Sequence, residues 1–208
     1  MKEQTFLMIK PDKNGNLPNF DFEGYIASKL PKTLKIEMAK KFMWSREGAE
    51  AHYAEHKGKP FYEGLIEMIT NGPCVGFIIS GEGAVDIVRN LAGSKADCVD
   101  GECILPEKNS LRYEIPIIDL YLDCYCEAPK LHDTDLIYSF YNSQDNEVIS
   151  AIRVGDKGLN VTYSKKYNWV HSSDGKVDEK TGIRSNDYEV KNFKNEMLKQ
   201  PEFSENVK

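Results

Sequence analysis

Two short runs of apolar residues, at 5–9 and 74–79, constrain the fold of this chain more than any other feature of its sequence. The runs lack the alternation of apolar and polar side chains that marks a strand with one face in water. Both faces of these segments must therefore be buried, as in the central strands of a sheet that is covered on each side. We predict that the two runs form such strands.

Helical and strand patterns surround the two runs in a regular order. A helix is predicted after the loop at 14–19, then a strand at 34–39, then a helix with Ser45 as its N-cap. Pro60 opens a further helix, and Gly93 ends the last helix in this half of the chain. The resulting order, βαβααβα, predicts one α/β sandwich.

The sequence beyond Gly93 is more polar and less regular. We predict a polar excursion at 97–109, an extended segment at 111–126 and short β-like pieces between 150 and 170. A weakly apolar segment at 188–198 is predicted to form a solvated terminal helix that frays.

The composition argues against several classes of protein. The 208 residues include 27 Lys and Arg against 33 Asp and Glu, a net charge of −6, which argues against bulk binding of nucleic acid. A mean hydropathy of −0.52 without a long apolar run argues against a membrane span. The chain starts without the apolar region of a signal peptide, which predicts a cytoplasmic protein. The odd number of cysteines, at spacings unlike a zinc ribbon, predicts reduced thiols and no metal site: Cys74, Cys98, Cys103, Cys124 and Cys126.

Four segments carry a recognisable pattern. Residues 5–12 read Thr-Phe-Leu-Met-Ile-Lys-Pro-Asp, and residues 52–61 read His-Tyr-Ala-Glu-His-Lys-Gly-Lys-Pro-Phe. Asn-Gly-Pro at 71–73 precedes an apolar strand, and Gly-Glu-Gly-Ala-Val at 81–85 follows it. In this order the segments resemble those of nucleoside diphosphate kinases, most closely over about 33–94.

The resemblance implies a ferredoxin-like fold of the α/β sandwich type, in which a βαββαβ order builds a four-stranded antiparallel sheet with helices. We expect this domain, with inserted segments, at 1–150 and a partly ordered C-terminal extension at 151–208. The resemblance also implies that the γ-phosphate of ATP passes to a second nucleoside diphosphate through a phosphohistidine, in a ping-pong reaction with Mg²⁺ on the bound nucleotide. ATP and nucleoside diphosphates are the expected partners, and a homo-oligomer is expected, a tetramer or hexamer built from dimers.

Phosphoryl transfer needs cations around the phosphates, and an acidic chain must gather them in one cleft. The resemblance assigns this role to Lys10 and Arg89, which would otherwise be expected to be ordinary solvated charges. The same role for Arg112 rests on a shorter match at residues 110–113. Lys95 stands where the family has a phosphate-binding threonine, and it is expected to act as a point charge.

Two aromatic residues fall at cleft positions of the family. Phe61 corresponds to a phenylalanine that stacks on the base, and such stacking tolerates any base. On helical spacing alone, Phe61 is equally compatible with a place in the core of its helix. Tyr53 corresponds to a tyrosine beside the catalytic histidine.

The resemblance implies that the nucleophile is a histidine, because the family reaction runs through a phosphohistidine. A neutral imidazole can make this attack near neutral pH. His52 and His56 lie in the matched segment, where the family has no nucleophile, and His171 lies in a polar stretch beyond the match. The core of the family motif reads His, a small residue, Ser and Asp. Residues 132–135, His-Asp-Thr-Asp, resemble this motif, so His132 is the predicted nucleophile.

The surroundings of this histidine agree with the family only in part. Glu55 matches the carboxylate that orients the histidine ring. Asp133 puts a negative charge where phosphates approach, and Pro129 replaces an asparagine that contacts the ribose. These departures support a second hypothesis, a divergent member that binds nucleotides with little or no kinase activity. A third hypothesis makes the chain an assembly scaffold that interacts through residues 150–208.

Overall fold

The computed structural model describes residues 2–11, 15–17, 19–95, 97–99, 102–104, 106–107, 109–115, 136–141, 148–155, 158–163 and 170–200. These residues form two compact units. The first unit holds the described residues up to Ala92 and those from Val170 onward, and the second unit holds those between. Within this part of the chain, no helix is both long and apolar enough to cross a bilayer.

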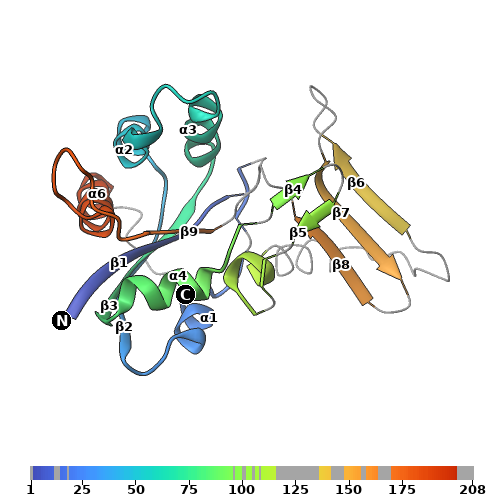
Figure 1. Ribbon diagram of the computed structural model, residues 1–208, viewed down its shortest axis with the longest axis horizontal. Coiled ribbons are helices and arrows are strands. Elements are labelled where there is room, and N and C mark those ends of the chain that lie inside the picture. Colours follow the sequence, from blue (N-terminus) through green and yellow to red (C-terminus); the bar gives the residue numbers. More distant parts are fainter. Residues whose placement is uncertain are drawn as a thin grey trace. The chain divides into compact units, whose positions relative to one another are not determined.

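The first unit is built on a four-stranded antiparallel sheet (Figure 1). Its strand order is β2 (Leu34–Phe42), β3 (Cys74–Glu82), β1 (Lys2–Ile9) and β9 (Val170–Ser172). The two apolar runs are the central strands β1 and β3, as predicted, and their core residues are fully buried. The sheet confirms the predicted ferredoxin-like class.

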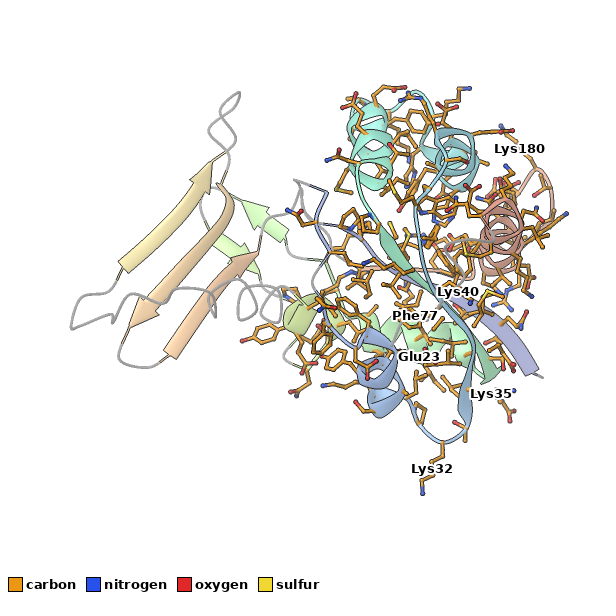
Figure 2. The ribbon with its side chains drawn as sticks, turned by 180° about the vertical axis from the view of Figure 1, so that it is seen from behind. Glu23, Lys32, Lys35, Lys40, Phe77 and Lys180 are labelled. Carbon is orange, nitrogen blue, oxygen red and sulfur yellow. The ribbon has the colours of Figure 1, made fainter. Side chains whose placement is uncertain are left out.

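Helices cover both faces of this sheet. Figure 1 shows α2, α3 and α6 on one side and α1 and α4 on the other. Figure 2 shows buried Phe77 inside the unit, whereas Lys32 and Lys180 extend outward. The helices are α1 (Phe22–Lys29), α2 (Arg46–His52), α3 (Tyr62–Thr70), α4 (Ala84–Ala92) and α6 (Ser185–Lys199), with a short 3₁₀ helix, η1 (Ala54–His56), after α2.

The start of α2 follows from its first residues. Ser45 is the N-cap, as predicted, and its Oγ accepts a hydrogen bond from Gly48 N at 3.0 Å. This bond satisfies one of the backbone donors that every helix leaves unpaired in its first turn. The helix ends at His52, whose ring packs against the buried rings of Phe6 and Trp44.

The C-terminal helix α6 is part of the core, so the prediction of a solvated, fraying helix is wrong. Phe193 is fully buried, and its ring centroid lies 4.9 Å from those of both Phe6 and Phe42. Gly76 of β3 makes room for it, because a Cβ there would lie 2.6 Å from the Phe193 ring. Val190 and the partly buried Met197 of the same helix also pack against this core.

Polar contacts hold the rest of α6 in place, which is why its sequence does not have the pattern of a buried helix. Asn186 Nδ2 donates to Gln4 O at 2.8 Å, and Glu196 Oε1 accepts from Ser45 N at 2.8 Å. Asn186 and Glu196 are buried although they are polar. The inner face of α6 therefore mixes polar residues with its apolar ones, which weakens the stripe by which a buried helix is recognised in sequence.

The second unit contains two antiparallel sheets. One pairs β4 (Asp97–Val99) with β5 (Glu102–Ile104), and the other has the order β6 (Leu136–Tyr141), β7 (Val148–Gly155) and β8 (Gly158–Tyr163). Strands β7 and β8 confirm the predicted β-like pieces. The polar excursion at 97–109 contains the hairpin of β4 and β5.

The predicted extended segment at 111–126 is wrong at 111–115, where the chain is helical. Leu111 and Ile115 are both buried one helical turn apart, and Ser110 Oγ accepts from Tyr113 N at 3.3 Å. The remainder of that segment lies outside the described residues. The division of the chain at residue 150 stays a prediction, whereas the contacts group β9 and α6 with the first 92 residues.

Replacing Phe193 with Ala is expected to lower the free energy of unfolding by about 3–5 kcal/mol, because a fully buried aromatic ring is removed from the core. Leu198→Ala, on the same helix but 81% exposed, is the matched control and should change it by less than about 0.5 kcal/mol. Urea unfolding of both variants measures the difference. Equal effects would contradict the packing of α6 in the core.

Candidate functional site

His171 lies on β9, beside the central strand β1. The strand register pairs His171 with Met8, and directly paired residues of antiparallel strands point to the same face. Met8 belongs to the core beneath α2, α3 and α6. The His171 side chain therefore reaches into that face of the sheet, and 21% of it stays exposed.

A carboxylate from α6 holds the His171 ring. His171 Nε2 lies 2.9 Å from Glu189 Oε2, and Ser173 Oγ donates to the same oxygen at 2.5 Å. Ser173 is tied to β1 in turn, because Phe6 N donates to Ser173 Oγ at 3.3 Å. The ring is thus fixed by a carboxylate whose own position is fixed by a buried hydroxyl.

Glu189 keeps its charge in spite of its burial. Burial raises the pKa of this carboxyl, but the charge of His171 and its hydrogen bond outweigh burial and lower the pKa to about 2. A charged carboxylate accepts a hydrogen bond only from a protonated nitrogen, so Nε2 of a neutral His171 carries the proton. Its Nδ1 then carries the lone pair that can attack an electrophile.

His52 is the most unusual residue near His171. It is 5% exposed, and neither of its ring nitrogens has a hydrogen-bond partner among the described residues. Burial, followed by the charge of His171, lowers the pKa of His52 to about 3, so it is neutral at physiological pH. The rings packed around it belong to Phe6, Trp44, Tyr53 and His171, with centroids 4.6–5.5 Å away.

Tyr53 and Lys10, both predicted site residues, lie in this neighbourhood. The Tyr53 ring centroid is 5.7 Å from that of His171, and burial raises the pKa of Tyr53 well above its usual value, so it stays protonated. Lys10 is 5% exposed and directly follows Ile9, which pairs with Val170 of β9. Its positive charge contributes to the lowered pKa of His52.

Three further predicted residues of the first unit are exposed. Phe61 is 54% exposed just before α3, so it is not a core residue of that helix; its ring contacts His56 at a centroid distance of 5.5 Å. Glu55 is exposed and lies 3.6 Å from His56 Nε2, whereas Glu189 contacts His171. Arg89 is exposed on the last turn of α4.

The remaining predicted residues lie elsewhere in the chain. Arg112 and Lys95 belong to the second unit, where Arg112 Nη1 donates to Gly93 O and Lys95 is exposed. His132 lies outside the described residues, as do Pro129 and Asp133. The assignment of His132 as nucleophile therefore stays a prediction.

A signal for His171 was present in the sequence and was missed. Residues 171–174 read His-Ser-Ser-Asp and match all four positions of the expected motif, whereas residues 132–135 depart from it at two. The family has an asparagine three residues before its histidine. Asn168 stands at this position before His171, whereas Pro129 stands there before His132. The long segment that separates Arg112 from this motif hid the match. Glu189, 18 residues further on, had no comparable signal.

The first half of the chain is similar in sequence to known proteins. The family model described as nucleoside diphosphate kinase matches residues 3–114. The nucleoside diphosphate kinase of Staphylococcus carnosus (strain TM300) is 44% identical over 92 residues, which cover 44% of this chain and 59% of that protein. The chain thus matches only about three fifths of the length of this curated relative.

Solved structures extend the likeness over most of the chain. The Aquifex aeolicus nucleoside diphosphate kinase superposes with a TM-score of 0.54 at 19% identity, covering 93% of this chain and 95% of that one, which supports the fold. The Halobacterium salinarum nucleoside diphosphate kinase, solved in complex with CDP, has a TM-score of 0.52 at 25% identity. This second comparison covers 93% of this chain and 88% of that one.

The burial of neutral His52 predicts a dependence of stability on pH. Between about pH 6.5 and 3 the unfolded chain holds a proton on His52 that the folded chain does not, so acidification favours unfolding. Between pH 7 and 5 the wild type should lose about 2 kcal/mol more stability than His52→Phe, which keeps an aromatic ring but cannot titrate.

Urea unfolding at the two pH values, with a chelating agent present, measures this difference. At pH 7, His52→Phe should be at least as stable as the wild type, since it removes two buried polar atoms that have no partner. An equal loss of stability in both proteins on acidification would contradict a neutral, buried His52.

Proposed function

Because the chain belongs to the nucleoside diphosphate kinase family, we propose that it transfers the γ-phosphoryl group of a nucleoside triphosphate to a second nucleoside diphosphate, with His171 as the intermediate acceptor. The observation that carries this assignment is the contact of His171 Nε2 with charged Glu189, which leaves Nδ1 as the reactive nitrogen. The motif at residues 171–174 supports it independently.

The proposed reaction has two symmetrical halves. The Nδ1 lone pair attacks the γ-phosphorus in line, the bond from that phosphorus to the bridging oxygen breaks, and the diphosphate leaves with the electron pair. The imidazole becomes positively charged as the N–P bond forms, and the Glu189 carboxylate stabilises this charge through the Nε2 proton. A second diphosphate then takes the phosphoryl group by the reverse step.

Cations of the chain are proposed to hold the phosphates. Lys10 is supported by its place at the end of β1, one residue beyond the pairing with β9. The same role is proposed for Arg89, Arg112 and Lys95. Tyr53 packs beside His171 and limits the positions of its ring.

Magnesium is proposed to reach the site on the nucleotide phosphates, where it supplies charge neutralisation. The ligand atoms around His171 are better suited to a magnesium ion carried by the nucleotide than to one bound permanently by the protein. Magnesium prefers several oxygen ligands, whereas the oxygen Oε2 of Glu189 is already engaged by His171 and Ser173. The chain's own residues therefore bind the nucleotide and orient the histidine.

The exposed ring of Phe61 is proposed to stack on the base. Its exposure of 54% leaves a face for a planar ligand, and Lys59 Nζ lies 5.8 Å from its centroid. The relative from Halobacterium salinarum was solved with CDP, which supports a nucleotide as the ligand. We also propose that the chain is cytoplasmic and assembles into a dimer-based tetramer or hexamer. Light scattering of the purified chain would test the assembly.

The decisive experiment compares His171→Ala with His132→Ala. Incubation with γ-labelled ATP should give an acid-labile phosphoenzyme in the wild type and in His132→Ala, and none in His171→Ala. Exchange of the γ-phosphate to a second diphosphate should fall by about 10³-fold or more in His171→Ala, because the nucleophile is lost.

The opposite pattern of loss would identify His132 as the acceptor. Binding of nucleotide without a phosphoenzyme in any of the three proteins would favour the divergent binding protein instead. Thermal stabilisation by ADP, measured in parallel, separates loss of chemistry from loss of binding.

Phe61→Ala is expected to weaken nucleotide binding about 5- to 150-fold, because stacking of a base on an aromatic ring is worth about 1–3 kcal/mol. Phe61→Trp restores a stacking surface and should restore binding. Calorimetric titration with ADP and CDP gives the two affinities. A loss in Phe61→Ala that Phe61→Trp fails to rescue would argue against stacking.

A further inference from the structure

The two ring nitrogens of His52 pose a physical problem that the phosphotransfer reaction does not solve. A neutral imidazole presents one donor and one acceptor, and both are buried here without a partner among the described residues. Burial of polar atoms without hydrogen bonds is unfavourable, and such atoms usually contact an ordered water or an ion. The site therefore has an unused donor set next to His171.

Three ligand atoms meet at this point from three different elements. His52 at the end of α2, His171 on β9 and Glu189 on α6 each offer one atom, and these atoms lie within 4.8 Å of one another. His52 is buried, and the other two are largely buried. Two of the three ligands are imidazole nitrogens, which an exposed patch of carboxylates does not offer.

We propose that His52, His171 and Glu189 form a binding site for a zinc-like transition-metal dication, which competes with phosphorylation of His171. Two histidines and one carboxylate, with a fourth position open, are an established ligand set for zinc. Imidazole ligands favour zinc, copper and nickel over magnesium and calcium, which prefer oxygen. The site is thus selective against the magnesium that accompanies nucleotides.

The geometry needs only a small adjustment to bind the metal. Zinc bonds of about 2.0–2.1 Å place the ligands of a tetrahedral site about 3.4 Å apart. His171 Nε2 and Glu189 Oε2 are already 2.9 Å apart, so the metal replaces the proton between them or takes the other ring nitrogen. No two of the three ligand atoms are more than 4.8 Å apart, so rotation of the His52 ring has to shorten its distances to the other two by about 1.4 Å at most.

Binding of the metal has a functional consequence. An imidazole whose nitrogen lone pair is shared with a metal, or whose ring has turned toward it, is no longer placed to attack phosphorus. Zinc is therefore an inhibitor that leaves the phosphate-binding cations unaffected. The inhibition rests on the proposed function, whereas the binding does not.

The binding is tested by calorimetric titration of ZnCl₂ into the metal-free full-length chain, wild type and His52→Phe. His56→Ala is the matched control, because His56 is a partly exposed histidine beside a carboxylate, Glu55. The wild type and His56→Ala should each bind one zinc ion more per chain than His52→Phe, and zinc should raise their melting temperatures more. Comparison with His52→Phe removes any zinc held by the cysteines or His132.

Three outcomes would overturn the site: equal zinc binding in the wild type and His52→Phe, an equal loss in His56→Ala, or no zinc binding by the wild type. Should His52→Phe lack the circular dichroism spectrum of the wild type, Glu189→Gln takes its place and should weaken zinc binding at least tenfold. Unchanged affinity in that variant would equally overturn the site.

Phosphoenzyme formation at increasing zinc concentration separates the site from the proposed function. In the wild type, zinc should block formation of the labelled phosphoenzyme. The zinc concentration that halves labelling should be at least tenfold higher for His52→Phe than for the wild type. Binding that depends on His52 without any block of labelling would support the metal site and overturn the competition, while the labelling of His171→Ala shows separately whether His171 is the acceptor.

Discussion

The pairing of β9 with β1 is the interaction on which the rest of the site depends. It joins residues 167 positions apart, with Ser173 N donating to Phe6 O at 3.0 Å. The register sets His171 opposite Met8, on the face where α6 brings Glu189. A slip of one residue would turn His171 to the other face of the sheet, away from its carboxylate. The site is thus a product of strand register.

Buried charge inside this face of the sheet is stabilised by pairing. A buried carboxylate is unfavourable unless it is paired, and Glu189 is paired with both His171 and Ser173. His52 beside it is kept neutral and has no partner among the described residues. Proteins break the rules of polar burial most often at functional sites, which supports the proposed role of this cluster.

The sequence was sufficient where a pattern is local. The two apolar runs predicted β1 and β3, and the Ser45 cap predicted the start of α2, because burial and capping leave marks at fixed short spacings. The sequence pattern failed at α6, where Val190, Phe193 and Met197 supply the apolar contact and buried polar residues supply the rest. The motif at residues 171–174 marks His171 in the sequence, but its distance along the chain from the matched segments hides the match.

The sequence by itself determined the family, the central strands and the residue types available for the proposed phosphate chemistry, because these depend on composition and short-range order. Only the tertiary structure decided which carboxylate meets which histidine. Glu55 stays at the surface, whereas Glu189, distant from the matched segments, reaches His171. That choice depends on the long-range pairing of β1 with β9 and the docking of α6, and no spacing along the chain records it.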